Sequence, residues 1–332
     1  MSWTIGNYAL SQAQMNANAV EVYKYFSGRG WSLNAIAGIL GNMQSESYVN
    51  PGVWQSLNEG NYSGGFGLVQ WTPATNYTNW AMANGYSITD PNGQLYWIDT
   101  LSESTGQWIP TGSYNMSWVA FKTSGSSPED LASAFLKNFE RAGVEVESAR
   151  RSQARSFYNL LSQYDTNSKA IESAVQWAIG IANDNSHGYD QGSRWGPDYD
   201  CSSLLITAYQ QAGIKVKDAG ATYTGNMYAA FKSCGFQDVT GSVNLSSGSG
   251  VQRGDILLNV ASHTAMSIGN GQVVQASQNE NGGATGGATG DQTGQEIWCT
   301  SYYNFPWNYV LRLPGGSTGT TTSIYIVQWI PG

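Results

Sequence analysis

The chain of 332 residues carries few charged side chains, with 15 Lys and Arg against 23 Asp and Glu, 11% in all, and a formal net charge of −8. This balance excludes a basic groove for nucleic acid and electrostatic docking on an anionic membrane. Aromatic residues reach 13% and glycine numbers 40. A surface of amides, hydroxyls and aromatic rings favours neutral polar ligands such as glycans.

No apolar run approaches the length of a membrane span, so no membrane insertion is expected. The first residues, MSWTIGNYALSQAQMN, lack the basic start and apolar stretch of a signal peptide. The three cysteines and two histidines are too widely spaced for a disulfide framework or a zinc knuckle, so we expect no metal and no organic cofactor. We expect Cys234 and Cys299 to be small buried side chains.

The first half of the chain reads as mostly helical. Ser11 is expected to cap a helix that runs to about Phe26, and Ser32 to cap another. Ser127, followed by a proline and two acids, predicts a helix that ends near residue 141. A last helix is expected over 146–164. The polar run 165–168 then predicts a break, and we place the boundary between two domains there.

The second half predicts helices near 169–183 and from Cys201 to about residue 212, followed by short apolar runs from residue 255 onward that are typical of strands. Helices followed by an antiparallel sheet indicate an α+β fold. Residues 281–294 are rich in glycine and are expected to form a mobile loop. The expected domains are 1–165 and 166–314, and 315–332 would be a linker and short tail, either an extra strand or part of an attachment segment.

An apolar stripe at positions 36, 39, 40 and 43 continues onto Glu46, one helical turn after Met43. A carboxylic acid at the end of a buried stripe loses hydration, which raises its pKa. A general acid for glycosidic cleavage needs such a shift. The alternative is a helix-end glutamate that faces solvent.

The residues around this glutamate resemble a known family. The segment GILGNMQSESYVNP, followed by GGFGLVQWTPAT, resembles the lysozyme-like fold and most closely the phage tail lysozyme family, over roughly residues 10–160. The run from Gly67 to Gln70 resembles the Gly-Leu-Met-Gln segment of lytic transglycosylases and goose-type lysozymes. The resemblance implies that Glu46 is the acid and that Gln70 lines the sugar-binding groove.

A second carboxylate is not identified by any motif. Glu59, Asp90 and Asp99 are candidates, and each has the alternative interpretation of a solvated loop acid. Without a second carboxylate, the enzyme is either a hydrolase or a transglycosylase that uses the sugar's own hydroxyl.

Cys201 opens a helix after a loop of turn-forming residues, and His263 opens a strand. The unpaired N–H groups at a helix N-terminus favour the reactive thiolate. A nucleophile on a helix that meets a histidine on a sheet is typical of papain-like folds. The alternative is a small buried cysteine and an unrelated histidine.

The sequence segments around Cys201 and His263 show a second resemblance. RWGPDYDCSSL, residues 194–204, resembles the Asp-Cys-Ser signature of NlpC-type peptidoglycan hydrolases, and HTAMSIGNG resembles their histidine strand. Residues 168–314 look like the bacteriophage peptidoglycan hydrolase (amidase) family, whose members cut the muramoyl–L-alanine amide or a bond in the stem peptide. The resemblance implies Cys201 as nucleophile and His263 as base, and we expect Asp200 and Tyr199 to contact the substrate.

The imidazole needs a third group to orient it. A hairpin turn at 269–271 would place position 265 opposite 275, so that His263 and Gln275 share a face. Glu280 is the competing candidate, at the mouth of the glycine-rich loop. We favour Gln275. His187 is expected to have a structural role in its loop, and Trp195, Trp298 and Trp307 either stack on glycan or pack.

These observations predict a bifunctional phage lysin that degrades Gram-positive peptidoglycan, with a glycosidase and a cysteine amidase or endopeptidase. The alternatives are a cysteine peptidase with an inactive lysozyme-like domain, and a structural tail-tip protein that only binds the wall. The expected partners are peptidoglycan and other phage tail proteins. The expected location is the virion tail, or the host cytoplasm with release to the wall.

Overall fold

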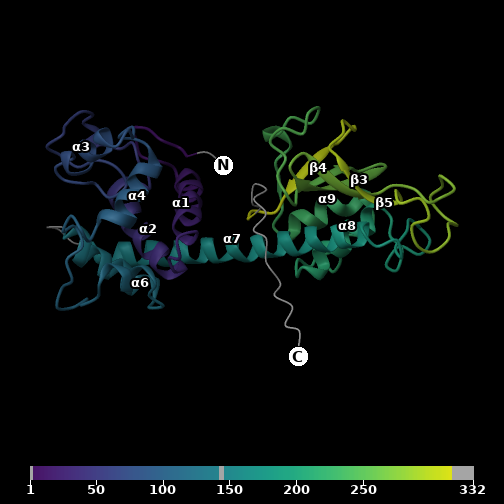
Figure 1. Cartoon of the computed structure of the whole chain (residues 1–332), viewed down its shortest axis with the longest axis horizontal. Coiled ribbons are helices and arrows are strands. Elements are labelled where there is room, and N and C mark those ends of the chain that lie inside the picture. The colour runs from purple at the N-terminus through teal and green to yellow at the C-terminus, as the bar shows by residue number, and fades with distance from the viewer. Residues whose placement is uncertain (1–2, 142–145, 316–332) are drawn as a thin grey trace, which may run out of the picture. The chain divides into compact units, whose positions relative to one another are not determined.

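A computed structural model describes residues 3–141 and 146–315 of the chain. The contacts divide the chain into two compact units, Met1–Gln163 and Tyr164–Gly332. Helices make up the first unit, and the second combines helices with an antiparallel sheet (Figure 1). The expected α+β fold class is confirmed. The predicted tail, 315–332, lies almost wholly outside the described residues.

The elements of the first unit follow one another with short connections. Its helices, including the first part of a long one that continues into the second unit, are α1 (Gln12–Ser27), α2 (Leu33–Ser47), η1 (Gln55–Leu57), α3 (Thr75–Ala83), α4 (Pro91–Leu101), α5 (Trp118–Lys122), α6 (Pro128–Phe135), the π-helical η2 (Leu136–Glu140) and α7 (Glu147–Ala182).

Serine side chains begin three of these helices, as the sequence predicts. The side chains of Ser11, Ser32 and Ser127 accept hydrogen bonds from the backbone N–H groups of residues 14, 35 and 130. Each bond satisfies a donor that the first helical turn leaves unpaired. The sequence therefore fixes where α1, α2 and α6 start.

Two glycines of α2 allow neighbouring helices to approach its backbone closely. A Cβ atom added to Gly38 would lie 2.9 Å from the Leu131 side chain of α6. One added to Gly41 would lie 2.4 Å from the backbone oxygen of Arg150 and 2.8 Å from the backbone nitrogen of Ala154, both in α7. Only glycine fits at these contacts, so α6 and α7 pack against α2 at short range.

The predicted helix break at 165–168 is wrong, because α7 continues through it from Glu147 to Ala182. The polar side chains of this stretch find partners without ending the helix. Asp165 accepts a hydrogen bond from Lys169 one turn later at 2.7 Å, and Ser168 Oγ donates to the Tyr164 carbonyl at 2.9 Å. Asn167 Nδ2 donates to the Pro314 carbonyl at 2.7 Å.

The second unit packs helices against a six-stranded sheet whose order is β1-β6-β2-β3-β4-β5, and every pairing is antiparallel. Its elements beyond α7 are α8 (Cys201–Gln211), α9 (Thr224–Ser233), β1 (Gln237–Asp238), η3 (Thr240–Ser242), β2 (Ile256–Asn259), β3 (His263–Gly269), β4 (Gln272–Ala276), β5 (Ile297–Ser301) and β6 (Tyr309–Arg312). The predicted helix from Cys201 and the strands predicted from residue 255 onward are confirmed. The sequence did not indicate α9 and β1.

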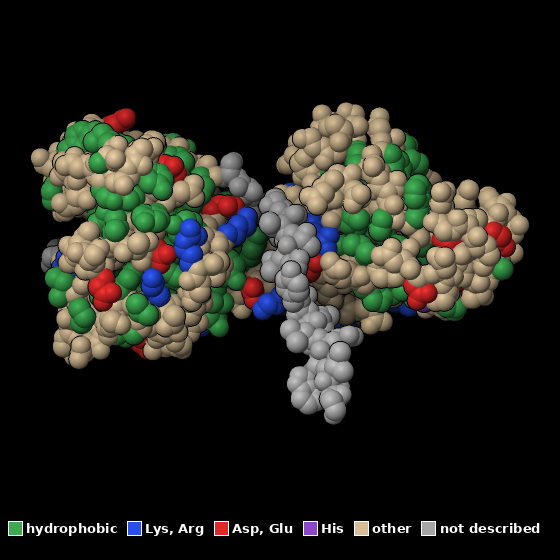
Figure 2. Space-filling model, in the orientation of Figure 1, with side chains coloured by type: hydrophobic (Ala, Val, Ile, Leu, Met, Phe, Trp, Pro, Cys, Tyr) green, Lys and Arg blue, Asp and Glu red, His purple; other side chains and the backbone are tan. Residues whose placement is uncertain are grey.

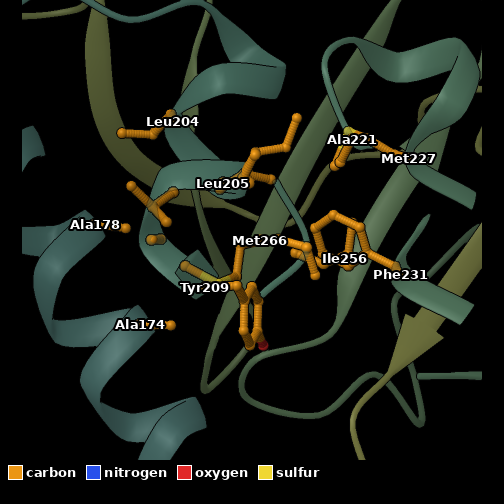
Figure 3. Close-up of a cluster of buried hydrophobic side chains, with 14 of the residues drawn as sticks. Ala174, Ala178, Leu204, Leu205, Tyr209, Ala221, Met227, Phe231, Ile256 and Met266 are labelled. Carbon is orange, nitrogen blue, oxygen red and sulfur yellow. The ribbon is translucent and has the colours of Figure 1, made fainter. Parts of the chain in front are cut away.

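A buried apolar cluster joins the helices of this unit to its sheet (Figure 3). Ala174 and Ala178 of α7 face Leu205 and Tyr209 of α8, and Met266 of β3 lies beside them. The Tyr209 hydroxyl donates to the carbonyl of Gly254, so its one polar atom is satisfied inside the core. This packing holds the start of α8 against β3, where Cys201 and His263 lie.

The glycine-rich loop before β5 is irregular, as expected, but it is anchored. Asp291 accepts hydrogen bonds from the backbone N–H groups of Thr293, Gly294 and Glu296, at 2.9, 2.6 and 2.9 Å. The N–H of Gly290 donates to Asp198 Oδ1 at 3.0 Å. The expected mobility therefore does not extend to the end of the loop that leads into β5.

The contact between Gly41 and α7 generates a test of the fold. Gly41→Ala is expected to lower the free energy of unfolding by about 1–3 kcal/mol, because the added methyl group overlaps the α7 backbone. Gly180→Ala is the matched control, since no atom lies within 4 Å of a Cβ built there. It should raise stability by up to about 1 kcal/mol through helix propensity. Chemical denaturation of the full chain measures both, and equal effects would contradict the close approach.

Candidate functional sites

A cavity of about 770 Å³ opens in the first unit beside the end of α2. Glu46 and Gln70 both line it, so the structure brings together the two side chains that the sequence motifs single out. Tyr48 and Trp54 add aromatic rings, and Asn76 adds an amide. A carboxylate among amides and the exposed ring of Tyr48 suits a neutral, hydroxyl-rich ligand.

Ser47 connects the two motif segments. Its hydroxyl lies 2.9 Å from the Met43 carbonyl within α2 and 2.8 Å from the Leu68 carbonyl in the loop that carries Gln70. The same loop is held from α4, where Gln94 Oε1 accepts the Leu68 N–H at 2.8 Å. Since all these groups are buried, the bonds fix the distance between the helix end and the loop.

The sequence analysis expects Glu46 to end the apolar stripe in apolar surroundings. The structure instead places a charged partner beside it. Its Oε1 accepts a hydrogen bond from Arg150 Nη2 of α7 at 2.6 Å. Arg150 also donates to Asn42 Oδ1 at 3.1 Å. The arginine side chain is only 8% exposed and that of Glu46 18%, so this is a largely buried ion pair.

The three candidates for a second carboxylate lie elsewhere. Asp90 caps α4 through the Asn92 N–H at 2.8 Å, and Asp99 accepts hydrogen bonds from the Trp31 indole and from Lys122. Glu59 is exposed, and none of the three lines the cavity. The acidic residue that does line it besides Glu46 is Glu140, at the end of η2. The sequence analysis missed this residue.

Cys201 is the first residue of α8, and it is buried. Backbone N–H groups of Ser202 and Thr264 act on its sulfur and lower its pKa, but burial and the Asp200 carboxylate have the larger effect. The outcome is a pKa raised to about 11, so the resting group is a thiol. The amide donors at the start of α8 favour the thiolate, as the sequence analysis expects, but desolvation and the Asp200 carboxylate outweigh them.

His263 forms a compact polar group with two other side chains. Its Nε2 lies 2.8 Å from Gln275 Oε1 and 3.1 Å from the Tyr303 hydroxyl, which also donates to that Gln275 oxygen. Because an amide oxygen only accepts, Nε2 carries the imidazole proton and Nδ1 presents a lone pair. Burial lowers the pKa of His263, which keeps the ring neutral.

The register of strands β3 and β4 explains why His263 and Gln275 lie close together. Met266 pairs with Val274 and Ser267 with Val273, which brings position 265 opposite 275 as the hairpin argument predicts. The register shifts only beyond Ser267, at a bulge next to the turn. Glu280, the competing candidate, accepts hydrogen bonds from its own loop, from Asn281 and Ala288. Tyr303 was not indicated by the sequence analysis.

The two predicted substrate contacts beside Cys201 are buried. Asp200 caps α8 by accepting from the Ser203 N–H at 2.7 Å, and its second oxygen pairs with Arg194 at 3.0 Å. Tyr199 packs edge-on against Trp177. Their contact with substrate remains a prediction, whereas the contacts seen explain how α8 is started and held.

The remaining residues that the sequence analysis named make packing or loop contacts. Cys234 and Cys299 are half-buried against the core of the second unit. His187 joins its loop to the Pro197 carbonyl at 2.6 Å, in keeping with the expected role. Trp195 is exposed beneath Lys217, whereas Trp307 is buried near the His263 ring.

Charged side chains are sparse on the surface shown in Figure 2, where uncharged polar groups and backbone predominate. Among residues 3–141 and 146–315, no cluster of three or more His, Cys, Asp or Glu side chains could hold a metal ion. Within the same residues, no helix combines the length and apolar character needed to cross a bilayer.

A carboxylate in an amide-lined cavity, and a hydrogen-bonded histidine on a strand that packs against the helix begun by a cysteine, are arrangements typical of hydrolases. Comparison with known families agrees with this class. Residues 17–161 match the phage tail lysozyme family, and residues 196–274 and 273–326 match the endolysin-like domain. These matches support a phage peptidoglycan hydrolase.

A curated relative is Morphogenesis protein 1 of Bacillus phage B103, which is 44% identical over 156 residues. The match covers 47% of this chain and 42% of that protein. The chain therefore spans less than half the length of this relative, and the likeness is partial.

The raised thiol pKa generates a second prediction. Alkylation of Cys201 by iodoacetamide should be slow near neutral pH and should accelerate as the pH rises toward about 11, since only the thiolate reacts. Mass spectrometry of the modified peptide measures the rate at this residue, and chelators should not alter it. A fast rate that is constant from neutral pH upward would mean that the resting group is a thiolate.

Proposed function

We propose that the chain is a bifunctional phage lysin of Gram-positive peptidoglycan, which cuts glycan strands with its first unit and a muramoyl–L-alanine amide or stem-peptide bond with its second. The observation that carries the proposal is the pair of sites: Glu46 with Gln70 in one cavity, and His263 hydrogen-bonded to Gln275 beside the Cys201 helix. Such a chain acts from the virion tail or from the host cytoplasm, with peptidoglycan and other tail proteins as its partners.

In the first unit, the cavity binds the glycan and Glu46 takes part in proton transfer. Sugar rings pack on the exposed ring of Tyr48, and the amides of Gln70 and Asn76 bond to hydroxyl and N-acetyl groups. Protonation of the glycosidic oxygen makes it a better leaving group as the C1–O bond breaks.

In the second unit, the thiol and the neutral imidazole react together. His263 Nδ1 takes the Cys201 proton as the sulfur attacks the amide carbonyl carbon, and the imidazolium then protonates the leaving amine. Water hydrolyses the thioester that remains. Gln275 and Tyr303 hold the ring in the tautomer that leaves Nδ1 basic.

Two substitutions separate the activities. Glu46→Gln should lower glycan cleavage on the order of 10²–10⁴-fold and spare peptide cleavage, because an amide keeps the shape but cannot transfer the proton. Cys201→Ala should abolish peptide or amide cleavage and spare glycan cleavage. Mass spectrometry of digested peptidoglycan distinguishes the two sets of new ends.

The same experiment decides among the alternatives. Glycan cleavage that is unaffected by Glu46→Gln would contradict the assignment of that residue. Peptide ends without any new glycan ends in the wild-type digest would indicate a single-activity peptidase. No new ends of either kind would indicate a protein that only binds the wall.

The orientation of His263 provides a further prediction. Gln275→Ala should lower peptidase turnover about 10²-fold, because a misplaced base cannot reach the thiol proton. Glu280→Ala removes an acid of the neighbouring loop and should have little effect. Turnover with a model amide substrate measures both variants, and the reverse ranking would make Glu280 the orienting group.

A further inference from the structure

The cavity beside Glu46 contains a second carboxyl group whose surroundings are unusual. Glu140 ends the π-helical η2 and is followed by Arg141 in the left-handed region, at φ 50°. The residue lines the cavity, yet its Oε1 is buried and has no hydrogen-bond partner among the described residues. A buried acceptor without a partner costs stability, so a purely structural role does not account for it.

Charged groups from two other helices and from the next residue of the chain lie near Glu140. Glu46 approaches from α2, Arg150 from α7, and Arg141 follows it in the chain. Arg150 donates its Nη atoms to Glu46 and Asn42, and Arg141 donates to the carbonyls of residues 107 and 138. Among the observed hydrogen bonds, none joins either guanidinium to Glu140.

The two carboxyl groups of the cavity, those of Glu140 and Glu46, have different electrostatic surroundings. Burial, followed by the nearby Glu46 carboxylate, raises the pKa of Glu140 well above its ordinary value of 4.5, and Arg150 and Arg141 only partly oppose this. Burial therefore favours the protonated form of Glu140, while Arg150 forms the ion pair with Glu46. Two carboxyl groups with opposite protonation states are what acid–base glycoside hydrolysis requires.

We propose that Glu140 is the second carboxyl group of the glycosidase site and that it shares one proton with Glu46. This inference rests on the proposed glycan cleavage. The pair's proton goes to the glycosidic oxygen, which leaves with the electrons of the C1–O bond. A water oxygen bonds to C1, and its proton returns to the pair. The product is a new reducing end, not an anhydro-sugar.

The test compares variants of the full chain on purified peptidoglycan across a range of pH. Glu140→Gln keeps the shape but removes the proton, and glycan cleavage should fall on the order of 10²-fold or more. Glu140→Asp retains a carboxyl group, so activity should persist with a displaced pH profile. Glu103→Gln, which removes an exposed acid of the same unit, is the matched control and should match the wild type.

The outcomes separate this inference from the function on which it rests. Wild-type rates and pH profile in Glu140→Gln, with Glu46→Gln inactive, would overturn the role of Glu140 alone. Wild-type rates in both would overturn the glycosidase assignment of Glu46. Anhydro-sugar ends in the wild-type digest would also overturn the inference, because they exclude water as the attacking group.

Stability provides a readout that does not depend on activity. The raised pKa means that the folded state favours the protonated form, so the contribution of Glu140 to stability is full below about 4.5 and is lost as the pH rises above it. As the pH rises, the free energy of unfolding of the wild type should therefore fall relative to that of the Glu140→Gln variant. A difference that is independent of pH would contradict the buried, protonated carboxyl group, even if the variant were inactive.

Discussion

The buried guanidinium of Arg150 is the contact on which the cavity of the first unit depends. It reaches from α7 to Glu46 and Asn42 of α2, and its charge faces Glu140 at the end of η2. Without it, the buried Glu140 carboxyl group and Glu46 would lie near one another with no buried cation between α2 and α7. A buried ion pair is costly unless its geometry is good, and the 2.6 Å contact meets that condition. The absence of a side chain at Gly41 lets the α7 backbone come close enough to deliver the arginine.

The second unit holds the Cys201 thiol and the His263 imidazole in their neutral forms, without an ion pair of the kind that Arg150 forms. Its thiol and imidazole are both neutral at rest, because burial raises the pKa of Cys201 and lowers that of His263. A neutral pair needs no compensating cation, and the Arg194 charge is instead directed to Asp200 at the helix cap. Burial thus favours the neutral form of a carboxyl group in the first unit and of an imidazole in the second.

Local signals predict much of this architecture. Serine caps predict the starts of α1, α2 and α6, and alternation with turn residues predicts β2 to β6 and the meeting of His263 with Gln275. The error at 165–168 has a physical cause. Polar residues favour a helix end when their side chains compete for backbone groups, but here they bond to a lysine one turn away and to the Pro314 carbonyl. The latter partner lies far along the chain, where no local pattern can indicate it.

The functional residues that the sequence did not indicate show where such reasoning has to be extended. Glu140 follows Leu136 by one helical turn, and the same continuation of an apolar face onto an acid that singled out Glu46 applies to it. The signal was present, but no family motif directed attention to it. Tyr303 is different, because it lies in an irregular segment after β5 and reaches His263 only through the folded sheet. Periodicity can therefore find a cavity-lining acid on a helix, whereas a hydroxyl supplied by a loop has to be found from the fold.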